Sequence, residues 1–299
     1  MTPVLLDSLA VISGSSVPSG DFTESVWRAA LFYIFLVAAG LAIDVALMFR
    51  WARTPMGWRD RAARIKWRPW SRTEAYRLVI LLMGLYLVVN IIHTVLGTPE
   101  EEPGVGWVVL QSLFFHIAGL GFIAAALKRQ NLTWREVFGF RVRPVSKDLS
   151  LGVMFYLGIL PILVFYTAVY HTGLQFAGYE PMPQEVVMVF AGEPSWIARA
   201  YMVFLAAVIA PLFEELLFRG VALPLVARRL GVAPAVVLIS AFFAIVHFHT
   251  ASLVPLFLIA VGFSLAYIYS GSLLVPIVMH SLFNTVNLVL LMMLKGAIQ

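Results

Sequence analysis

The sequence contains no cysteine and few charged residues. Of its 299 residues only 12% are Asp, Glu, Lys or Arg, whereas a soluble domain usually carries about 25%. The absence of cysteine excludes disulfide bonds, thiolate metal sites and a cysteine nucleophile. The scarcity of charge excludes an ordinary soluble surface, because 61% of the residues are hydrophobic. Lipid is therefore the expected solvent for most of this chain.

Long apolar runs fill most of the sequence and predict membrane-spanning helices. A helix crosses the hydrocarbon core in about 20 residues, and its backbone groups bond within the segment, as lipid requires. We expect an all-α, polytopic transmembrane helix bundle with about eight transmembrane helices. The predicted spans are 27–49, 78–97, 105–127, 149–170, 196–217, 232–248, 253–270 and 273–294.

The basic residues are concentrated in alternate loops. The segments 50–77, 128–148 and 219–231 together hold 18 of the 21 Lys and Arg residues, while the opposite loops carry glutamates. Cytoplasmic loops of membrane proteins are enriched in Lys and Arg. This pattern predicts that the three basic segments are cytoplasmic, that 172–195 is external and that both termini lie outside. The net charge of +5 is then a signal of topology.

The basic segment 50–77 also contains four tryptophans, Trp51, Trp58, Trp67 and Trp70. Basic and aromatic residues that alternate in this way can bind nucleic acid. Tryptophan beside arginine next to a membrane span is more typical of an anchor at the lipid–water interface. We therefore expect interfacial anchors and a bilayer partner, and no nucleic-acid partner.

Two adjacent carboxylates end one of the apolar runs. Glu215 lies four residues before Arg219, so both side chains share one helix face and can pair, whereas Glu214 points about 100° away. Pro211 lacks an N–H and leaves the carbonyl of Ala207 without its helical donor, which favours a kink before the carboxylates. Because Arg219 is spaced to neutralise Glu215, we expect Glu215 to be structural and Glu214 to be the available base.

Two further pairs of residues have the same helical spacing. Phe243 precedes His247 by four residues, and His280 precedes Asn284 by four, so each pair shares a helix face. Ionisable groups inside a membrane usually mark function. If these pairs converge on Glu214, the carboxylate can take a proton from water, a histidine can assist, and an Asn–His pair can stabilise an oxyanion.

The three patterns together resemble the CAAX protease and bacteriocin-processing family of intramembrane glutamic endopeptidases, which includes the type II CAAX prenyl endopeptidases. The pattern is Glu-Glu-x-x-x-Arg, then Phe-x-x-x-His, then His-x-x-x-Asn. Its positions are filled here by Glu214, Glu215, Arg219, Phe243, His247, His280 and Asn284. The resemblance covers about the second half of the chain, and it suggests a protease core at 149–299 behind an N-terminal transmembrane region at 1–148.

The resemblance implies proteolysis within the membrane, on membrane-embedded or lipidated peptides and proteins. The residues can serve as base, assisting group and oxyanion donors without a metal, so we expect no cofactor. Glu214 would activate the water and His247 would assist. His280 and Asn284 would stabilise the oxyanion. The remaining motif residues, Glu215, Arg219 and Phe243, would support the site.

Other functions remain open at the level of sequence. Buried carboxylates and proline-broken helices also suit an ion-coupled or proton-coupled transporter. A non-catalytic binding protein that uses only the fold, such as an immunity protein, is a second alternative. Glu214, His247 and His280 are also a common ligand set for catalytic zinc. In straight helices His247 would lie nearer the outer face than Glu214, so convergence needs a tilted or broken helix.

Overall fold

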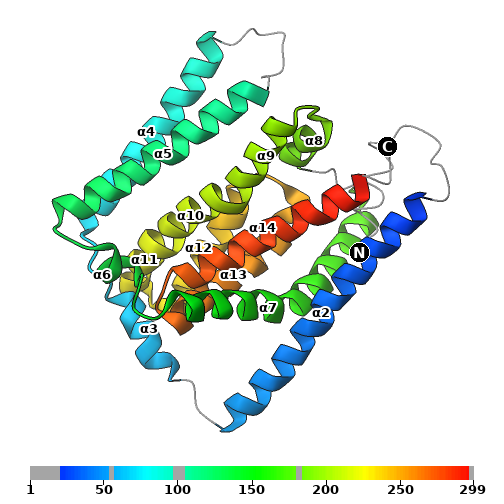
Figure 1. Cartoon of the computed structure of the whole chain (residues 1–299). Helices are drawn as coiled ribbons and strands as arrows, with labels where there is room; N and C mark the ends of the chain where they lie inside the picture. Colours follow the sequence, from blue (N-terminus) through cyan, green and yellow to red (C-terminus); the bar gives the residue numbers. More distant parts are fainter. Residues whose placement is uncertain (1–20, 54–56, 97–104, 180–183, 296–299) are drawn as a thin grey trace.

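A computed structural model describes residues 21–53, 57–96, 105–179 and 184–295, and every element in these ranges is a helix (Figure 1). The predicted all-α class is thereby confirmed. The elements are α2 (Asp21–Arg53), α3 (Trp58–Lys66), α4 (Arg72–Leu96), α5 (Val105–Arg129), α6 (Trp134–Phe138), α7 (Val145–Phe176), α8 (Glu185–Gly192), α9 (Trp196–Phe204), η1 (Leu205–Ile209), α10 (Ala210–Glu215), η2 (Leu216–Ala222), α11 (Leu223–Leu230), α12 (Val232–Ile245), η3 (Thr250–Ser252), α13 (Leu253–Ser270) and α14 (Leu274–Lys295).

The eight predicted spans overlap helices of the structure; the last residues of 232–248 lie in the turn after α12, and residue 97 of 78–97 lies outside the described residues. Within the described ranges, six helices are long and apolar enough to cross a membrane, and α12 is apolar but shorter. The six are Glu24–Arg50, Leu110–Arg129, Val145–Phe176, Trp196–Leu230, Thr250–Ser270 and Leu274–Met293. The chain is therefore an integral membrane protein with a polytopic helical bundle, as predicted.

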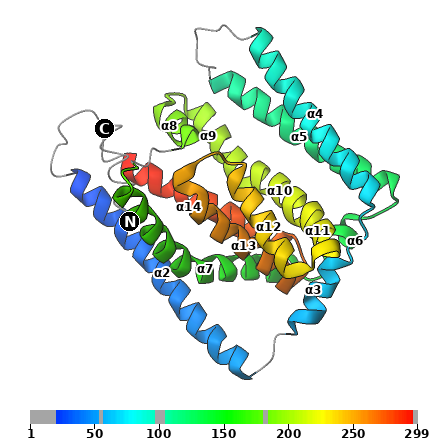
Figure 2. The ribbon, with the colours of Figure 1, turned by 180° about the vertical axis from the view of Figure 1, so that it is seen from behind.

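Consecutive long helices run in opposite directions, which brings the basic segments together (Figures 1 and 2). We call this end of the bundle the basic end; it comprises the described residues 57–72, 128–148, 228–231 and 270–274. The predicted basic loops contribute α3 and α6 to it, and α3 contacts both α11 and α13 there. The arrangement matches the alternation of charge along the sequence.

The helix α13 forms the centre of the bundle. Its residues Ile259, Ala260, Phe263, Ala266 and Tyr267 are fully buried, because α12, α14 and α7 all pack against it. The helix α2 covers α7 from outside, and the α4–α5 hairpin meets the bundle where α5 contacts α9 and α10 (Figure 2). Arg219, which donates to the carbonyl of Ala260 on this helix, is fully buried beside it.

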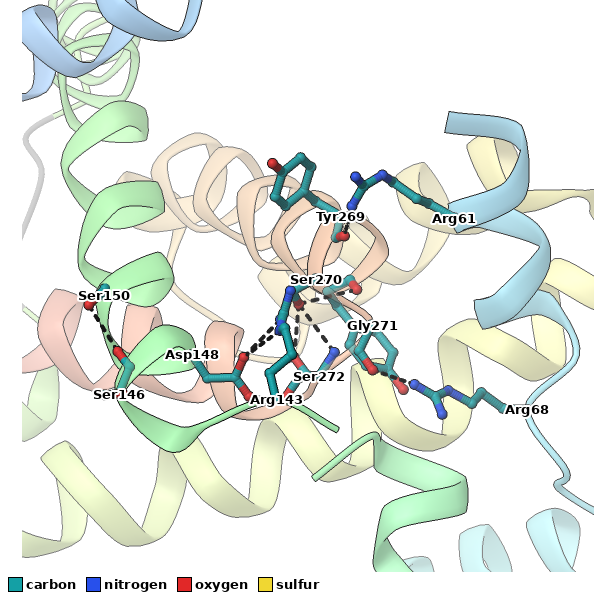
Figure 3. A network of polar contacts seen from close by, with 11 residues as sticks. Arg61, Arg68, Arg143, Ser146, Asp148, Ser150, Tyr269, Ser270, Gly271 and Ser272 are labelled. Carbon is teal, nitrogen blue, oxygen red and sulfur yellow. Dashed lines mark hydrogen bonds and ion pairs between the residues drawn. The ribbon is translucent and has the colours of Figure 1, made fainter. Parts of the chain in front are cut away.

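Arginine side chains tie the basic end together by binding backbone carbonyls. Arg61 of α3 donates to the carbonyl of Tyr269, and Arg68 donates to that of Gly271, where α13 ends (Figure 3). The last carbonyls of a helix have no donor within the helix, so these bonds satisfy groups that would otherwise need water. Arg228 of α11 likewise donates to the carbonyls of residues 66, 68 and 70.

Two sequence-based assignments at the basic end are wrong. Arg219 does not lie in a loop, because the helix that begins at Trp196 continues to Leu230 and buries Arg219 completely. Trp70 is not an interfacial anchor, because its side chain is only 2% exposed. Trp58 and Trp67 are exposed, as an anchor requires. The side chain of Trp51 lies outside the described residues.

Candidate active site

The site is built on a helix that contains two π-helical segments, each followed by a proline. The helix from Trp196 to Leu230 contains two π-helical segments, η1 and η2, which lie on either side of α10 and its two glutamates. In η1 the N–H of Ala210 bonds to the carbonyl of Leu205, five residues back. Pro211 follows η1, and Pro224 follows η2. π-helical segments are rare and are frequently found at functional sites.

Each proline leaves one carbonyl without a helical donor, and a distant side chain satisfies it. In the i→i−5 pattern of η1 the missing donor of Pro211 exposes the carbonyl of Ala206, to which Asn284 Nδ2 donates at 2.7 Å. Pro224 likewise lacks a donor after η2, and the carbonyl of Gly220, four residues before it, accepts from Trp70 Nε1 at 2.9 Å. Asn284 therefore holds the helix before the glutamates, and Trp70 holds it after them.

We expect Trp70→Phe to lower the stability of the protein, because phenylalanine keeps the ring and removes the donor. The buried carbonyl of Gly220 would lose its partner, at a cost of about 1–3 kcal/mol. The measurement is the thermal midpoint of unfolding in detergent. The matched control is Trp67→Phe, at a side chain that is 70% exposed. Equal effects of the two substitutions would mean that the bond to Gly220 contributes nothing particular.

A buried chain of charged and polar groups joins three of the predicted residues. Glu215 Oε1 accepts a hydrogen bond from Arg219 Nη1 at 2.8 Å and from His280 Nδ1 at 3.0 Å. Glu215 and Arg219 are fully buried, and His280 is 4% exposed. Arg219 also donates to the carbonyl of Ala260 at 3.0 Å. The predicted pairing of Glu215 with Arg219 is present, and it also orients His280.

Glu214 lies at the end of this chain without joining it. Its Oε2 atom is 3.9 Å from His280 Nε2, too far for a hydrogen bond, and its side chain is 23% exposed. In the described part of the chain, Glu214 Oε2 is buried and has no hydrogen-bond partner. Because Nδ1 of His280 faces a carboxylate, Nε2 is the nitrogen that remains for other partners. Glu214 Oε2 and His280 Nε2 therefore face each other without a direct hydrogen bond.

Aromatic rings enclose the charged groups. Phe263 stacks on His280 with ring centroids 4.8 Å apart, and Phe243 meets His280 edge-on at 5.8 Å. The guanidinium of Arg219 lies 4.7 Å from the centroid of Phe243 and 5.1 Å from that of Phe263. Cation–π contacts of this kind stabilise a charge that water cannot reach. Phe243 thus has a definite place in the site, between Arg219 and His280.

His247 adjoins the site through Phe243. It follows the end of α12, its side chain is exposed, and its ring lies 4.7 Å from that of Phe243. Its Nδ1 lies 2.6 Å from the carbonyl of Phe243. Because a carbonyl can only accept, Nδ1 carries the proton and Nε2 is left with a free lone pair. Among the described residues, no direct hydrogen bond or ring contact joins His247 to Glu214 or His280.

The structure thus brings together Glu214, Glu215, Arg219, Phe243 and His280. Asn284 lies one turn further along α14 than His280. His247 contacts this group through the ring of Phe243. The sequence analysis missed Trp70 and Phe263. Trp70 lies in the basic segment 50–77, and this position favours an interfacial anchor over a contact with the site. The apolar sequence around Phe263 contains no motif residue that would indicate a place in the site. Over the described ranges, no three His, Asp or Glu side chains gather closely enough to hold a metal ion.

The comparisons with known proteins agree with the resemblance predicted from the motifs. The model of the family described as type II CAAX prenyl endopeptidase Rce1-like matches residues 195–286. That segment contains all seven motif residues, from Glu214 to Asn284. Neither the curated proteins nor the solved structures yielded a match. Residues 195–286 are therefore similar to a CAAX-type protease family, which confirms the suspected relationship for this part of the chain.

Proposed function

We propose that this protein is an intramembrane endopeptidase in which Glu214 activates a water molecule. The observation that carries the proposal is the position of Glu214 Oε2, 3.9 Å from His280 Nε2 and without a hydrogen-bond partner in the described structure. Arg219 and His280 both pair with Glu215 through its Oε1 atom, so these three groups interact directly and Glu214 does not. The family match at residues 195–286 supports the same class of reaction.

In the proposed reaction, Glu214 takes one proton from the water, and the resulting hydroxide attacks the carbonyl carbon of the peptide bond. The carbonyl oxygen becomes an oxyanion, to which His280 Nε2 and the second amide hydrogen of Asn284 donate. Glu215 accepts from His280 Nδ1 and so stabilises the protonated imidazole. The tetrahedral intermediate then collapses, the C–N bond breaks, and the proton held by Glu214 passes to the leaving amine.

His247 assists from the exposed side of the site. Its free Nε2 can orient the attacking water or the leaving amine, and its contact with Phe243 couples it to the buried cluster. No metal ion is required by this scheme. Activity that a chelator abolished and zinc restored would instead favour the zinc alternative.

The substrates that fit this location are membrane-embedded or lipidated peptides and proteins, because the glutamates lie within a span of the bundle. We propose the cytoplasmic membrane as the location. The test is a comparison of peptide C-termini by proteomics in wild-type and Glu214→Gln cells. C-termini that appear only with the wild-type protein support the proposal. Identical C-termini together with ion transport by the purified protein in vesicles would favour a transporter, and a retained biological function of Glu214→Gln would favour a binding protein.

We expect Asn284→Ala to lower kcat much more than it raises KM. Loss of one oxyanion donor costs roughly 3–4 kcal/mol of transition-state stabilisation. The substitution also removes the donor to the carbonyl of Ala206, so a loss of stability of about 1–3 kcal/mol accompanies it. The measurement is the peptidase rate beside the thermal midpoint of unfolding.

The matched control is Asn287→Ala on the same helix. Asn287 Nδ2 donates to the carbonyl of Phe283 within α14, and its side chain is exposed. This variant should keep both rate and stability. If Asn284→Ala lowers the thermal midpoint and leaves kcat unchanged, Asn284 only holds the helix and has no part in the reaction.

The basic end is expected to face the cytoplasm. Because the chain has no cysteine, single cysteines report orientation without background. In intact cells Asp60→Cys on α3 should resist an impermeant thiol reagent, whereas Tyr179→Cys after α7 should react; both positions are exposed. The reverse labelling would invert the topology. The chain from 180 to 183 and the N-terminal segment to residue 20 lie outside the described residues.

A further inference from the structure

A hollow with a volume of about 680 Å³ opens at the basic end, away from the glutamates. Its lining includes the aromatic residues Trp134 and Phe140, the aliphatic residues Val145 and Leu274, and the arginines Arg135 and Arg141. The floor is therefore apolar and the only charged lining residues are cationic. A binding site with this composition suits a ligand that has both an anionic group and hydrocarbon.

The two arginines of the hollow are available to a ligand. Arg135 and Arg141 are exposed and have no ion pair or hydrogen bond to any side chain or carbonyl in the described ranges. The neighbouring arginines differ, since Arg143 pairs with Asp148 and Arg68 binds the carbonyl of Gly271 (Figure 3). Glu136, the carboxylate closest in sequence, accepts instead from Thr133 N at 2.7 Å.

Thr133 holds the carboxylate of Glu136, which makes no ion pair with Arg135 or Arg141 among the described residues. The side chain and the backbone of Thr133 donate to it and lower the pKa of its carboxyl group. The same residues form a capping box that starts α6 at Trp134. The carboxylate is thus engaged in holding the short helix that carries Arg135.

Hydrogen bonds join the segments that contribute residues to the hollow. Asp148 at the start of α7 binds both Arg143 and Ser272, which fixes α7 against the turn before α14 (Figure 3). The N–H of Leu273 donates to the carbonyl of Phe138 at 2.9 Å. Arg141 has a φ angle of 59°, a left-handed conformation that costs free energy in a non-glycine residue and is often found at functional sites.

An apolar stripe leads from the hollow along α7. Val145 lines the hollow, and Leu149 and Val153 follow at intervals of four residues, so that all three lie on one face of the helix. Their side chains are 42–50% exposed. In a membrane, this face is covered by hydrocarbon. The stripe therefore continues the apolar floor of the hollow in the direction of the bilayer core.

We propose that this hollow binds an anionic phospholipid, with the phosphate between Arg135 and Arg141 and an acyl chain along Val145, Leu149 and Val153. The charge of the rim selects an anion, and the stripe selects a ligand with a long hydrocarbon chain. A soluble phosphate has no hydrocarbon chain and would make no contact with the apolar stripe. The bound lipid would contact α6, α7 and the start of α14, and so join the basic end to the leaflet in which it lies.

Native mass spectrometry of the full-length protein, delipidated in detergent, tests this proposal. The probes are dioleoylphosphatidylglycerol and dioleoylphosphatidylcholine at equal concentration. The wild-type protein should bind the anionic lipid preferentially, and Arg135→Gln/Arg141→Gln should lower that binding about tenfold or more, because each basic residue near an anionic phosphate contributes to affinity. Glycerol phosphate, which lacks the chains, should bind at least about tenfold more weakly than the lipid.

Two matched variants make the result specific. Arg59→Gln/Arg64→Gln removes two exposed charges from α3, at the same end but outside the hollow, and should keep the binding of the anionic lipid. Arg135→Lys/Arg141→Lys keeps both positive charges and should keep most of the binding of the anionic lipid. Because both arginines of the hollow are exposed, their variants should unfold at the wild-type thermal midpoint. Equal binding of the two lipids, unchanged binding after loss of Arg135 and Arg141, or an equal loss in the α3 control would each overturn the proposal.

Discussion

Glu214→Gln is expected to lower the rate of peptide hydrolysis by at least about 100-fold, the contribution typical of a positioned general base. Glutamine has the shape of glutamate but cannot take a proton from water. The substitution should hardly affect folding, because Glu214 Oε2 makes no hydrogen bond in the described structure and the side chain is 23% exposed. The measurement is the peptidase rate of the purified protein beside its thermal midpoint in detergent.

Glu214→Asp serves as a control that keeps the negative charge but changes the position of the carboxylate. Aspartate keeps the carboxylate but is shorter by one methylene, so a rate between those of the wild type and Glu214→Gln is expected. A Glu214→Gln protein that hydrolyses its substrate at the wild-type rate would remove Glu214 from the reaction. A large fall in the thermal midpoint of this variant would show that Glu214 is structural.

Local spacing predicted most of the helical bundle and one ion pair. Apolar runs of about 20 residues have few alternatives in lipid, so the spans followed directly from composition. The pairing of Glu215 with Arg219 followed from their i, i+4 spacing, because this relation is set by one helix. His280 and Asn284 likewise share α14, and both side chains face the helix that bears the glutamates.

Relations between distant segments were not predictable in this way. The sequence suggested that Pro211 frees the carbonyl of Ala207, but the π-helical winding of η1 moves the free carbonyl to Ala206. The role of Trp70 depends on a contact with Gly220, 150 residues away. Phe263 enters the site only because α13 is central to the bundle. Each of these features depends on tertiary packing, which the sequence pattern of a single helix does not contain.

The position of His247 shows the same limit. Straight helices placed it far from Glu214, and the structure links it to the cluster by the ring of Phe243. The helix α12 has only 14 residues and ends at Ile245, so His247 lies in the turn that follows. The spacing of Phe243 and His247 placed them correctly side by side, but it could not say how close His247 comes to the glutamates.

Glu215→Gln should destabilise the protein much more than Glu214→Gln does. Glutamine removes the negative charge that compensates Arg219, a side chain that is fully buried. Breaking a buried ion pair by removing one partner costs about 3–5 kcal/mol. Arg219 cannot turn toward water, because Phe243 and Phe263 enclose its guanidinium and the carbonyl of Ala260 holds it. The thermal midpoint in detergent should fall accordingly.

The chain offers a matched control for this substitution. Glu24 and Arg28 form an ion pair with the same i, i+4 spacing, but their side chains are 63% and 68% exposed. Glu24→Gln should therefore leave the thermal midpoint unchanged, because water solvates the arginine that remains. A second variant, Glu215→Gln/Arg219→Met, removes the uncompensated charge and should recover part of the lost stability. If Glu215→Gln is inactive and as stable as the wild type, the two glutamates have the opposite roles, with Glu215 as the base.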